Sequence, residues 1–456
     1  MKFDELREVM RRAGIVGAGG AGFPSYAKLN IAADTVILNC SECEPLLKLH
    51  RQLLARYSKE LLMTLEEIVE ALGADRAIVA VKEAYTETVD AINAVLADFP
   101  KVQLSLMKEF YPAGDEVITV YETTGRVVAP GELPISVGCI VYNVETVYNV
   151  YRAWKDSAPV THKFVTVAGE VQNPCTVKAP LGISYGELIT MVGGSTLRDF
   201  AIISGGPMTG RVATVKDVVT KTTNAILVLP KNAYVVQKKL TPLTISINRV
   251  MAACCQCQMC TDLCSRHLLG HPIEPHKLMR AVASGVATDG DAFLGAFSCS
   301  SCGLCEMYSC GQGLNPAGII AATKNELRKN GVTPPKGGKV APVEPTREYR
   351  KISVSRLTAR LGLTQYDLPA PLIDVNIEMN SAKINLSQGI GALATPVVTV
   401  GQTVAVGDTV ADVEPEKLGT AIHASIGGIV TEVTDAYIII QKTTKSKRKD
   451  GVTNVQ

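Results

Sequence analysis

The stretch CCQCQMCTDLC, residues 254 to 264, places five cysteines within eleven positions, and CSSCGLCEMYSC, residues 299 to 310, adds four more. Nine of the thirteen cysteines therefore lie in these two knots. The opening residues MKFDELREVMRR are charged and lack the apolar region of a signal peptide, so we expect a cytoplasmic protein with reduced thiols. In that setting grouped cysteines more often bind metal than form disulfides. The knots therefore predict a metal-binding domain.

The spacing of the cysteines indicates which metal they bind. The first knot follows C-x2-C-x2-C-x3-C, the spacing of [4Fe–4S] sites in bacterial ferredoxins, and the second repeats the triplet with a gap of four residues before its last cysteine. In ferredoxins the fourth cysteine of each knot ligates the other cluster. This rule predicts one cluster on Cys254, Cys257, Cys260 and Cys310, and a second on Cys264, Cys299, Cys302 and Cys305. Cys255 is interpreted as a spare thiol, and the longer gap leaves open an altered or labile second cluster.

A structural zinc site is the alternative for these knots. Zinc sites typically combine two C-x2-C pairs across a longer loop, because a tetrahedral ion needs four ligands. Each triplet here already supplies three thiolates, which favours iron–sulfur clusters. The alternative would make the protein a zinc-stapled, non-catalytic scaffold.

Length and composition limit the classes of protein that fit. The 456 residues predict two to four domains, and 46% hydrophobic with 20% charged residues is typical of a folded soluble protein. A formal net charge of +2 argues against a nucleic-acid-binding protein. No stretch approaches the ~20 apolar residues of a membrane span. The basic run KSKRK at 445–449 is interpreted as part of a solvated tail.

Periodicity predicts a multidomain α/β protein. Residues 1–155 alternate helix-like and strand-like segments, which is typical of a mostly parallel sheet covered by helices. Within them DTVILNC (34–40) is expected as a strand and RQLLARYSKELLMTLEEIVEAL (51–72) as one long helix. The expected units are the α/β domain at 1–155, a small α+β module at 160–240, a two-cluster domain at 244–330, a linker at 331–369, a β-sandwich or barrel at 370–442 and a polar basic tail at 443–456.

A glycine-rich loop, GAGGAGFP at 17–24, separates a predicted helix from a predicted strand. Glycines let backbone N–H groups approach a phosphate closely, although they also serve ordinary turns. The loop is the first part of a larger constellation. It continues with Lys28, NCSECEP at 39–45, YPAGDE at 111–116 and VYNVET at 141–146.

These segments resemble the flavin- and NADH-binding subunit of respiratory complex I, and more closely the RnfC-like family with its PduS branch of cobalamin reductases. The loop VGAGGAGFPSYAKL, the segment ECEPLL, the stretch GRVVAPGELPISVGCIVYNVET and the two knots occur in the order of those families. The resemblance covers most of the chain. It implies a Rossmann-like FMN- and NADH-binding domain, a β-grasp module of the soluble-ligand-binding (SLBB) type, a ferredoxin-like two-cluster helical domain and a C-terminal barrel-sandwich domain. We expect the SLBB module to act as a scaffold.

The resemblance also assigns roles to matching residues. FMN phosphate and ribityl contacts would fall on Gly17, Gly19 and Lys28. Contacts to the flavin ring and its surroundings would fall on Asn39, Glu42, Glu44, Tyr111, Gly114, Asn143 and Thr146. NADH would stack over the flavin beside Phe23, in a pocket lined by Glu44, Asp115 and Glu116. The complex I pattern has an arginine at Ala18 and an acidic residue at Ser41, and these departures bear on nicotinamide selectivity.

The implied function is electron transfer from NADH through FMN and two [4Fe–4S] clusters. The PduS resemblance implies cobalamin as the acceptor, reduced towards cob(I)alamin in propanediol utilisation. It further implies a bacterial microcompartment as the location, with an adenosyltransferase and shell proteins as partners. The alternative within the family is an RnfC-type subunit that passes electrons between NADH and ferredoxin in a membrane complex.

Overall fold

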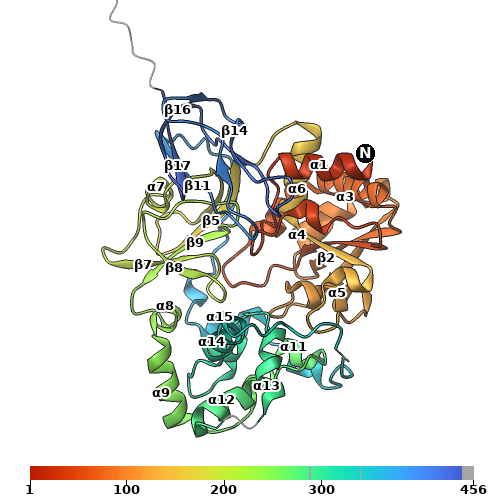
Figure 1. Cartoon of the computed structure of the whole chain (residues 1–456), viewed down its shortest axis with the longest axis vertical. Coiled ribbons are helices and arrows are strands. Elements are labelled where there is room, and N and C mark those ends of the chain that lie inside the picture. The colour runs from red at the N-terminus through yellow and green to blue at the C-terminus, as the bar shows by residue number, and fades with distance from the viewer. Residues whose placement is uncertain (287–288, 339, 444–456) are drawn as a thin grey trace, which may run out of the picture.

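The computed structural model describes residues 1–286, 289–338 and 340–443, and these form four units that pack against one another (Figure 1). The basic run at 445–449 lies outside the described residues. In the described part of the chain, no helix combines the length and apolar character that crossing a membrane requires.

The first unit is built on a four-stranded parallel sheet in the order β3-β2-β1-β4. Alternate residues of β1 point to opposite faces: Val36 and Leu38 pack into one core and Ile37 into another. The strands are β1 (Thr35–Cys40), β2 (Arg76–Lys82), β3 (Val102–Met107) and β4 (Cys139–Asn143). The first core is covered by α1 (Phe3–Arg12), α2 (Leu49–Arg56), α3 (Ser58–Leu72), α4 (Thr86–Asn93) and α6 (Val144–Lys155), and the second by α5 (Glu116–Thr124).

The prediction of one long helix over 51–72 is wrong in one respect. The structure has two helices, α2 and α3, which meet at Tyr57 with φ −121° and ψ 34°. The Ser58 hydroxyl donates to the carbonyl of Leu54 at 2.8 Å, a back-bond that competes with helix continuation. The Tyr57 ring packs on Tyr148 of α6, with centroids 4.9 Å apart, so tertiary packing fixes the break.

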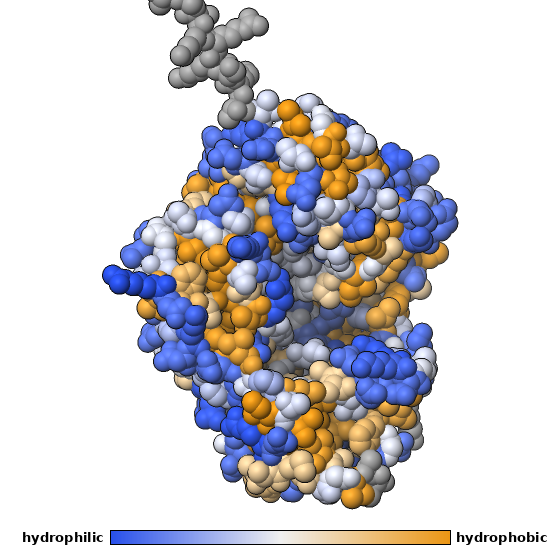
Figure 2. All heavy atoms as spheres, turned by 60° about the vertical axis from the view of Figure 1, so that its left-hand side comes forward, coloured by the Kyte–Doolittle hydropathy of each residue, from blue (hydrophilic) through white to orange (hydrophobic). Residues whose placement is uncertain are grey.

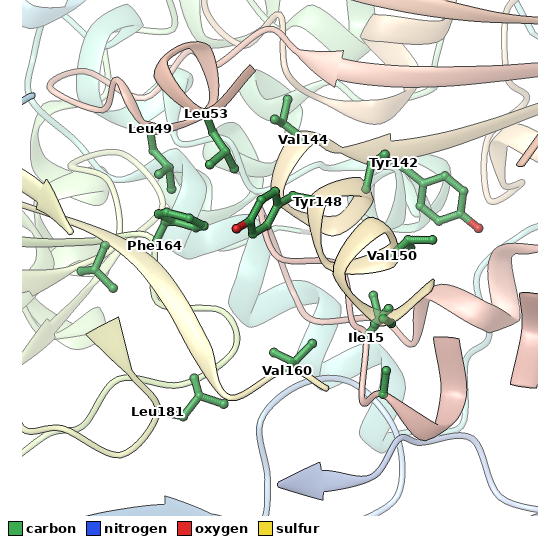
Figure 3. Close-up of a cluster of buried hydrophobic side chains, with 14 of the residues drawn as sticks. Ile15, Leu49, Leu53, Tyr142, Val144, Tyr148, Val150, Val160, Phe164 and Leu181 are labelled. Carbon is green, nitrogen blue, oxygen red and sulfur yellow. The ribbon is translucent and has the colours of Figure 1, made fainter. Parts of the chain in front are cut away.

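The second unit is a six-stranded sheet in the order β10-β6-β5-β9-β7-β8. Its elements are β5 (His162–Gly169), β6 (Cys175–Pro180), α7 (Tyr185–Met191), β7 (Phe200–Ser204), β8 (Arg211–Ala213), β9 (Ala225–Pro230) and β10 (Leu372–Ile373). Its core continues into the first unit. Figure 3 shows Phe164 of β5 facing Tyr148 of α6, and the two ring centroids lie 5.4 Å apart.

The third unit is helical and carries both cysteine knots. Its helices are α8 (Tyr234–Leu240), α9 (Leu243–Ala253), α10 (Met259–Asp262), α11 (Ser265–Leu268), α12 (Pro275–Ser284), α13 (Gly290–Gly295) and α14 (Pro316–Lys329). A small apolar core includes Val250, Leu278 and Ile319, and several knot cysteines pack at its edge.

Part of the segment expected as a linker is folded onto the other units. It contains a 3-10 turn at Arg347–Arg350 and the helix α15 (Val354–Arg360). The carbonyl of Ile352 accepts from the N–H of Tyr111 at 2.8 Å, and Leu357 is buried in the core around Tyr111. The segment therefore joins the first and third units.

The fourth unit contains two small antiparallel sheets, β11-β17-β16-β13 and β12-β14-β15. Their strands are β11 (Ser381–Asn385), β12 (Thr395–Pro396), β13 (Thr403–Val404), β14 (Thr409–Asp412), β15 (Ile422–His423), β16 (Gly428–Val433) and β17 (Tyr437–Gln441). The buried Lys221 of the second unit donates to the carbonyls of Gly14 and Ala421, both at 2.7 Å. One ammonium group thus joins three units.

Candidate functional site

The glycine loop is closed at its base and open at its tip. Its ends form a bridge between Val16 and Pro24, and the N–H of Gly17 donates to the carbonyl of Phe23 at 2.9 Å. The N–H of Ala18 donates to the Thr146 hydroxyl at 3.0 Å, so Thr146 holds the loop from α6. At the tip, residues 19–21 are exposed, and no hydrogen bond within the described chain occupies their N–H groups. Free N–H groups on a glycine turn are the donors that a phosphate binds.

Gly19 lies directly against Asn143 at the end of β4. A Cβ at Gly19 would come within 2.4 Å of the Asn143 amide nitrogen, so any larger residue would displace the Asn143 side chain. Asn143 also caps α6, where its side-chain oxygen accepts from the N–H of Glu145 at 3.0 Å. The predicted residues Gly19, Asn143 and Thr146 are therefore brought together around one loop.

The carboxyl end of the parallel sheet gathers a second group of predicted residues. Asn39 at the end of β1 is paired in register with Asn143, and its amide donates to the carbonyl of Gly114 at 3.0 Å. A Cβ on Gly114 would lie 2.8 Å from the carbonyl oxygen of Ser41, so this position too requires a glycine. Ligands of open α/β sheets bind at this edge.

Lys28 and Glu116 form an ion pair next to this edge. The Lys28 ammonium lies 2.5 Å from the Glu116 carboxylate and 3.1 Å from the carbonyl of Val141. The Glu116 side chain is 45% exposed, so this pair lies at the surface of the site. Phe23 is half-buried at the base of the loop.

Two buried charged groups lie behind the sheet edge. Glu42 accepts from the N–H of His50 at 3.1 Å through one oxygen, while its other oxygen has no hydrogen-bond partner in the described chain. The ammonium of Lys82, at the end of β2, is also buried without a partner there. Burial raises the pKa of Glu42 and lowers the pKa of Lys82. Sequence reasoning missed Lys82, whose only signal was a lysine ending an otherwise apolar strand.

Glu44 and Asp115, both predicted to line the NADH pocket, are engaged with other units. Glu44 accepts from the N–H groups of Met208 and Thr209 at 2.8 and 2.9 Å, and burial raises its pKa. Asp115 caps α5 and accepts from the Nε and Nη2 groups of Arg266. Arg266 follows Cys264, a predicted cluster ligand, by two positions, and sequence reasoning did not single it out.

The residues fit FMN on three observations. The open loop tip supplies N–H donors for a phosphate, and two glycines keep the sheet edge free of side chains. One buried carboxylate oxygen of Glu42 and the buried ammonium of Lys82 have no hydrogen-bond partner within the described chain. Gly17 and Thr146 would shape the phosphate loop, and Asn39, Gly114 and Asn143 would border the ring.

The two cysteine knots adopt the same local conformation. In the first, Gln256 and Gln258 have φ of 58° and 64°, and in the second, Ser301 and Gly303 have φ of 61° and 74°. These are the same positions relative to the first cysteine of each knot. Three of the four are not glycine, and such left-handed conformations are uncommon and typical of ligand sites.

The extra residue of the second knot is accommodated by a π-helical turn. Residues Cys305–Ser309 form this turn, which widens the helix by one residue before Cys310. In the first knot Cys264 is instead the N-cap residue of α11. The four-residue gap therefore changes the local helix without removing Cys310 from the site.

Two buried cysteines, Cys260 and Cys302, each lie near members of the set to which they are predicted to belong. Burial raises the pKa of Cys260 to about 12, with the nearby thiolates of Cys310, Cys257 and Cys254 contributing. Burial likewise raises the pKa of Cys302 to about 12, with Cys264 the strongest neighbouring thiolate. Cys255 and Cys257 are exposed, so the first set lies near the surface.

The donor set fits iron–sulfur chemistry. The first set lines a cavity together with Cys255, His276 and Met279. Backbone N–H groups point at the sulfurs: the N–H of Ser301 lies 3.3 Å from Cys299 and that of Leu314 lies 3.4 Å from Cys310. Such bonds tune cluster potentials. Among the described residues no group of three or more His, Cys, Asp or Glu side chains is arranged to hold a single metal ion.

Tyr111 joins the flavin site to the second cysteine set. It is buried between the units, and its hydroxyl donates to the carbonyl of Cys302 at 2.5 Å. The Asp115–Arg266 pair, 2.8 Å apart, bridges the same two regions. The second set is therefore the one next to the flavin site.

Comparisons with known proteins agree with this division. Family models match the Nuo51 FMN-binding domain at residues 10–152, the SLBB domain at 164–212, a 4Fe–4S dicluster domain at 253–315 and the RnfC barrel sandwich hybrid domain at 371–447. The cobalamin reductase PduS of Salmonella typhimurium is 41% identical over 438 residues, which cover 96% of each chain. PduS of Citrobacter freundii is 41% identical over 95% of this chain and 96% of its own.

The chain belongs to the PduS cobalamin reductase family. Within this RnfC-like family it combines an FMN-binding domain, an SLBB domain, a two-cluster domain and a barrel-sandwich domain, as the sequence predicted. A component of the Na⁺-translocating ferredoxin:NAD⁺ oxidoreductase complex of Acetobacterium woodii is 30% identical over 59% of each chain. A solved NAD⁺-reducing [NiFe]-hydrogenase chain matches at a TM-score of 0.45 and 22% identity, covering 81% of this chain and 68% of its own, which is too distant to decide the fold.

Proposed function

We propose that this protein takes electrons from NADH through FMN and two [4Fe–4S] clusters and reduces cob(III)alamin and cob(II)alamin towards cob(I)alamin. The relatives named cobalamin reductase span nearly the whole chain, and the FMN-binding and dicluster domains supply the redox parts. When bound, FMN accepts a two-electron hydride and the clusters carry single electrons.

The hydrogen bond from Tyr111 to the carbonyl of Cys302 carries this proposal. It fixes a predicted flavin-ring residue to the backbone of a predicted cluster ligand, in a site from which water is excluded by burial. The Asp115–Arg266 pair repeats the connection a short distance away. Both contacts would hold the flavin site and the second cysteine set in a fixed position relative to each other.

The remaining residues would bind and orient FMN and NADH. The tip of the glycine loop would hold the FMN phosphate, with Lys28 and Glu116 beside the entrance where NADH approaches. Phe23 would border the nicotinamide. Because Glu44 is held by Met208 and Thr209, its role would be to fix the SLBB domain at the flavin site and not to contact NADH.

We further propose that the protein works in a bacterial microcompartment of propanediol utilisation, beside an adenosyltransferase and shell proteins. The support is the name of the relatives alone. The adenosyltransferase would consume cob(I)alamin, which is too reactive to diffuse far.

An RnfC-type role in electron exchange with ferredoxin is the second candidate. The relative from Acetobacterium woodii favours it, although the match covers 59% of each chain.

The test compares the two acceptors. The anaerobically purified protein, with FMN and clusters loaded, is mixed with NADH and either hydroxocobalamin or ferredoxin, and acceptor reduction is followed by absorbance. We expect the cobalamin to be reduced at a rate that exceeds the rate without enzyme at least tenfold. Reduction of ferredoxin with none of cobalamin would overturn the proposal in favour of the second candidate.

A further inference from the structure

A polar cleft of about 690 Å³ lies beside the glycine loop, and no predicted role includes it. Its walls come from the SLBB domain, the barrel-sandwich domain and Gly20 of the loop. The face of the molecule in Figure 2 is hollowed near its middle. The lining includes Ser204, Thr209, Arg211, Thr214, Lys216, Asp217, Thr220, Thr222, Thr223, Lys383, Asn385, Ser387 and Gln388.

The walls of the cleft are fixed to the glycine loop. A Cβ on Gly22 would lie 2.6 Å from the Cα of Gly389 and 2.8 Å from the side chain of Thr222, so the loop packs without a gap against both domains. The N–H of Ile390 donates to the carbonyl of Gly22 at 3.2 Å. A molecule in the cleft would therefore touch the loop at Gly20, next to the N–H groups that we assign to the FMN phosphate.

Neutral hydrogen-bonding groups dominate the lining. Hydroxyl groups and two side-chain amides outnumber the charged groups, and several are held in place. The Tyr185 and Ser204 hydroxyls lie 2.6 Å apart, and the Thr223 hydroxyl accepts from the N–H of Thr220 at 3.1 Å. Such a surface suits a ligand with many neutral donors and acceptors.

Positive charge is confined to part of the lining. It comes from Arg211, Lys216 and Lys383, whereas the one carboxylate of the lining, Asp217, is already bound by Arg211 at 2.9 Å and by Thr214 at 2.8 Å. Because Arg211 is paired with Asp217, Lys216 and Lys383 are the cations that would attract an anionic group of an otherwise neutral ligand.

We propose that this cleft binds the corrinoid substrate. A cobalamin carries primary amides around the corrin ring and one phosphodiester in its nucleotide tail. The amides match the hydroxyl and amide lining, and the phosphodiester matches the cations. The inference rests on the proposed function and places the acceptor on the flavin side of the molecule, away from the exposed first cysteine set. It gives the SLBB domain a ligand, in place of the scaffold role that we expected from the sequence.

A steric block tests the site. Ser387→Trp puts an indole into the cleft from an exposed position. Ser381→Trp is the matched control, because Ser381 is exposed in the same domain and does not line the cleft. Binding of cyanocobalamin to the oxidised holoenzyme is measured by calorimetry without NADH, and the flavin absorbance of each variant checks its fold. We expect Ser387→Trp to weaken binding at least tenfold and Ser381→Trp to leave it unchanged.

The outcomes separate the two proposals. Unchanged cyanocobalamin binding by Ser387→Trp, in a wild-type protein that binds and reduces cobalamin, would overturn the cleft site and leave the function standing. A raised KM for NADH with ferricyanide as acceptor, in place of weaker cobalamin binding, would assign the cleft to the dinucleotide and also overturn the proposal. A wild-type protein that neither binds nor reduces a corrinoid would overturn the function itself.

Discussion

Lys82 and Glu42 are charged side chains buried at the carboxyl end of the parallel sheet. Each has a polar atom without a partner in the described chain, and burial shifts the pKa of each toward its neutral form. Leaving a buried charged group unpaired costs several kcal/mol, so a ligand that completes the bonding is favoured at this place. Glu42 could be predicted from the segment NCSECEP. Lys82 could not, because the strand RAIVAVK does not show that its last side chain is covered by Tyr85, whose ring lies 5.6 Å from the ammonium.

We predict that Lys82→Met weakens FMN binding by roughly tenfold, equivalent to about 1.4 kcal/mol. The reason is loss of a buried donor at the sheet edge. Quenching of FMN fluorescence on titration into flavin-free protein measures the affinity. The matched control is Lys101→Met, since Lys101 is 43% exposed and lies outside the site. Equal affinity of the Lys82→Met protein and wild type would show that Lys82 does not face the flavin.

The two cysteine knots show how much of a local element can be predicted from the sequence. The spacing and the ferredoxin rule predict the crossed ligand sets, and these sets stay a prediction, which the proximity of Cys260 to Cys310 and of Cys302 to Cys264 supports. The extra residue before Cys310 is visible in the sequence, but the π-turn at Cys305–Ser309 that accommodates it, with Met307 buried in the core around Tyr111, could not be predicted from spacing. The break at Tyr57 in the expected long helix could not be predicted either, because the Tyr57 ring packs on Tyr148 of another helix.

Cys310→Ala and Cys255→Ala form a pair that tests the ligand assignment. A [4Fe–4S] cluster holds four irons, so we expect the Cys310→Ala protein to fall from about eight irons per chain to about four. Cys255→Ala should keep about eight, because Cys255 lies outside both sets. Anaerobic iron and sulfide analysis gives both values. Loss of iron from Cys255→Ala with retention in Cys310→Ala would reverse the assignment.

At the scale of the whole molecule, the four units are held by buried polar contacts between them. Lys221 joins three units, Glu44 joins the flavin site to the SLBB domain, and Glu145 of α6 pairs with Lys163 of β5 in the interior. The order of the domains could be predicted from motifs. The contacts between the units could not be predicted, because a lysine or glutamate seen in one sequence is expected to be solvent-exposed.

We predict a pH-dependent contribution from Lys221. Burial lowers the pKa of Lys221 to about 7. Its ammonium faces Asp412 and His423, and burial lowers the pKa of His423 to about 3. Between pH 7 and the ordinary lysine pKa, Lys221 is protonated in the unfolded chain and neutral in the folded protein. The free energy of unfolding therefore increases as pH rises through this range, by at most about 1.4 kcal/mol per pH unit. Below pH 7 both states are protonated and the dependence ends.

Urea unfolding at pH 5.5, 6.5, 7.5 and 9 measures this contribution. The stability of wild type relative to Lys221→Met should increase from pH 7.5 to 9 and stay flat below pH 7. Lys417→Met, at a 57% exposed position, should show no such change. A difference between wild type and Lys221→Met that is constant over the whole range would contradict the prediction.

The connected path from NADH through FMN to both clusters is tested most directly by anaerobic reductive titration with NADH, followed by absorbance. FMN takes two electrons and each cluster one, so we predict that about two equivalents of NADH bleach the flavin band and the broad iron–sulfur absorption together. Bleaching of the flavin alone after about one equivalent, with the iron–sulfur absorption unchanged, would show that the contact between Tyr111 and Cys302 does not connect the two centres.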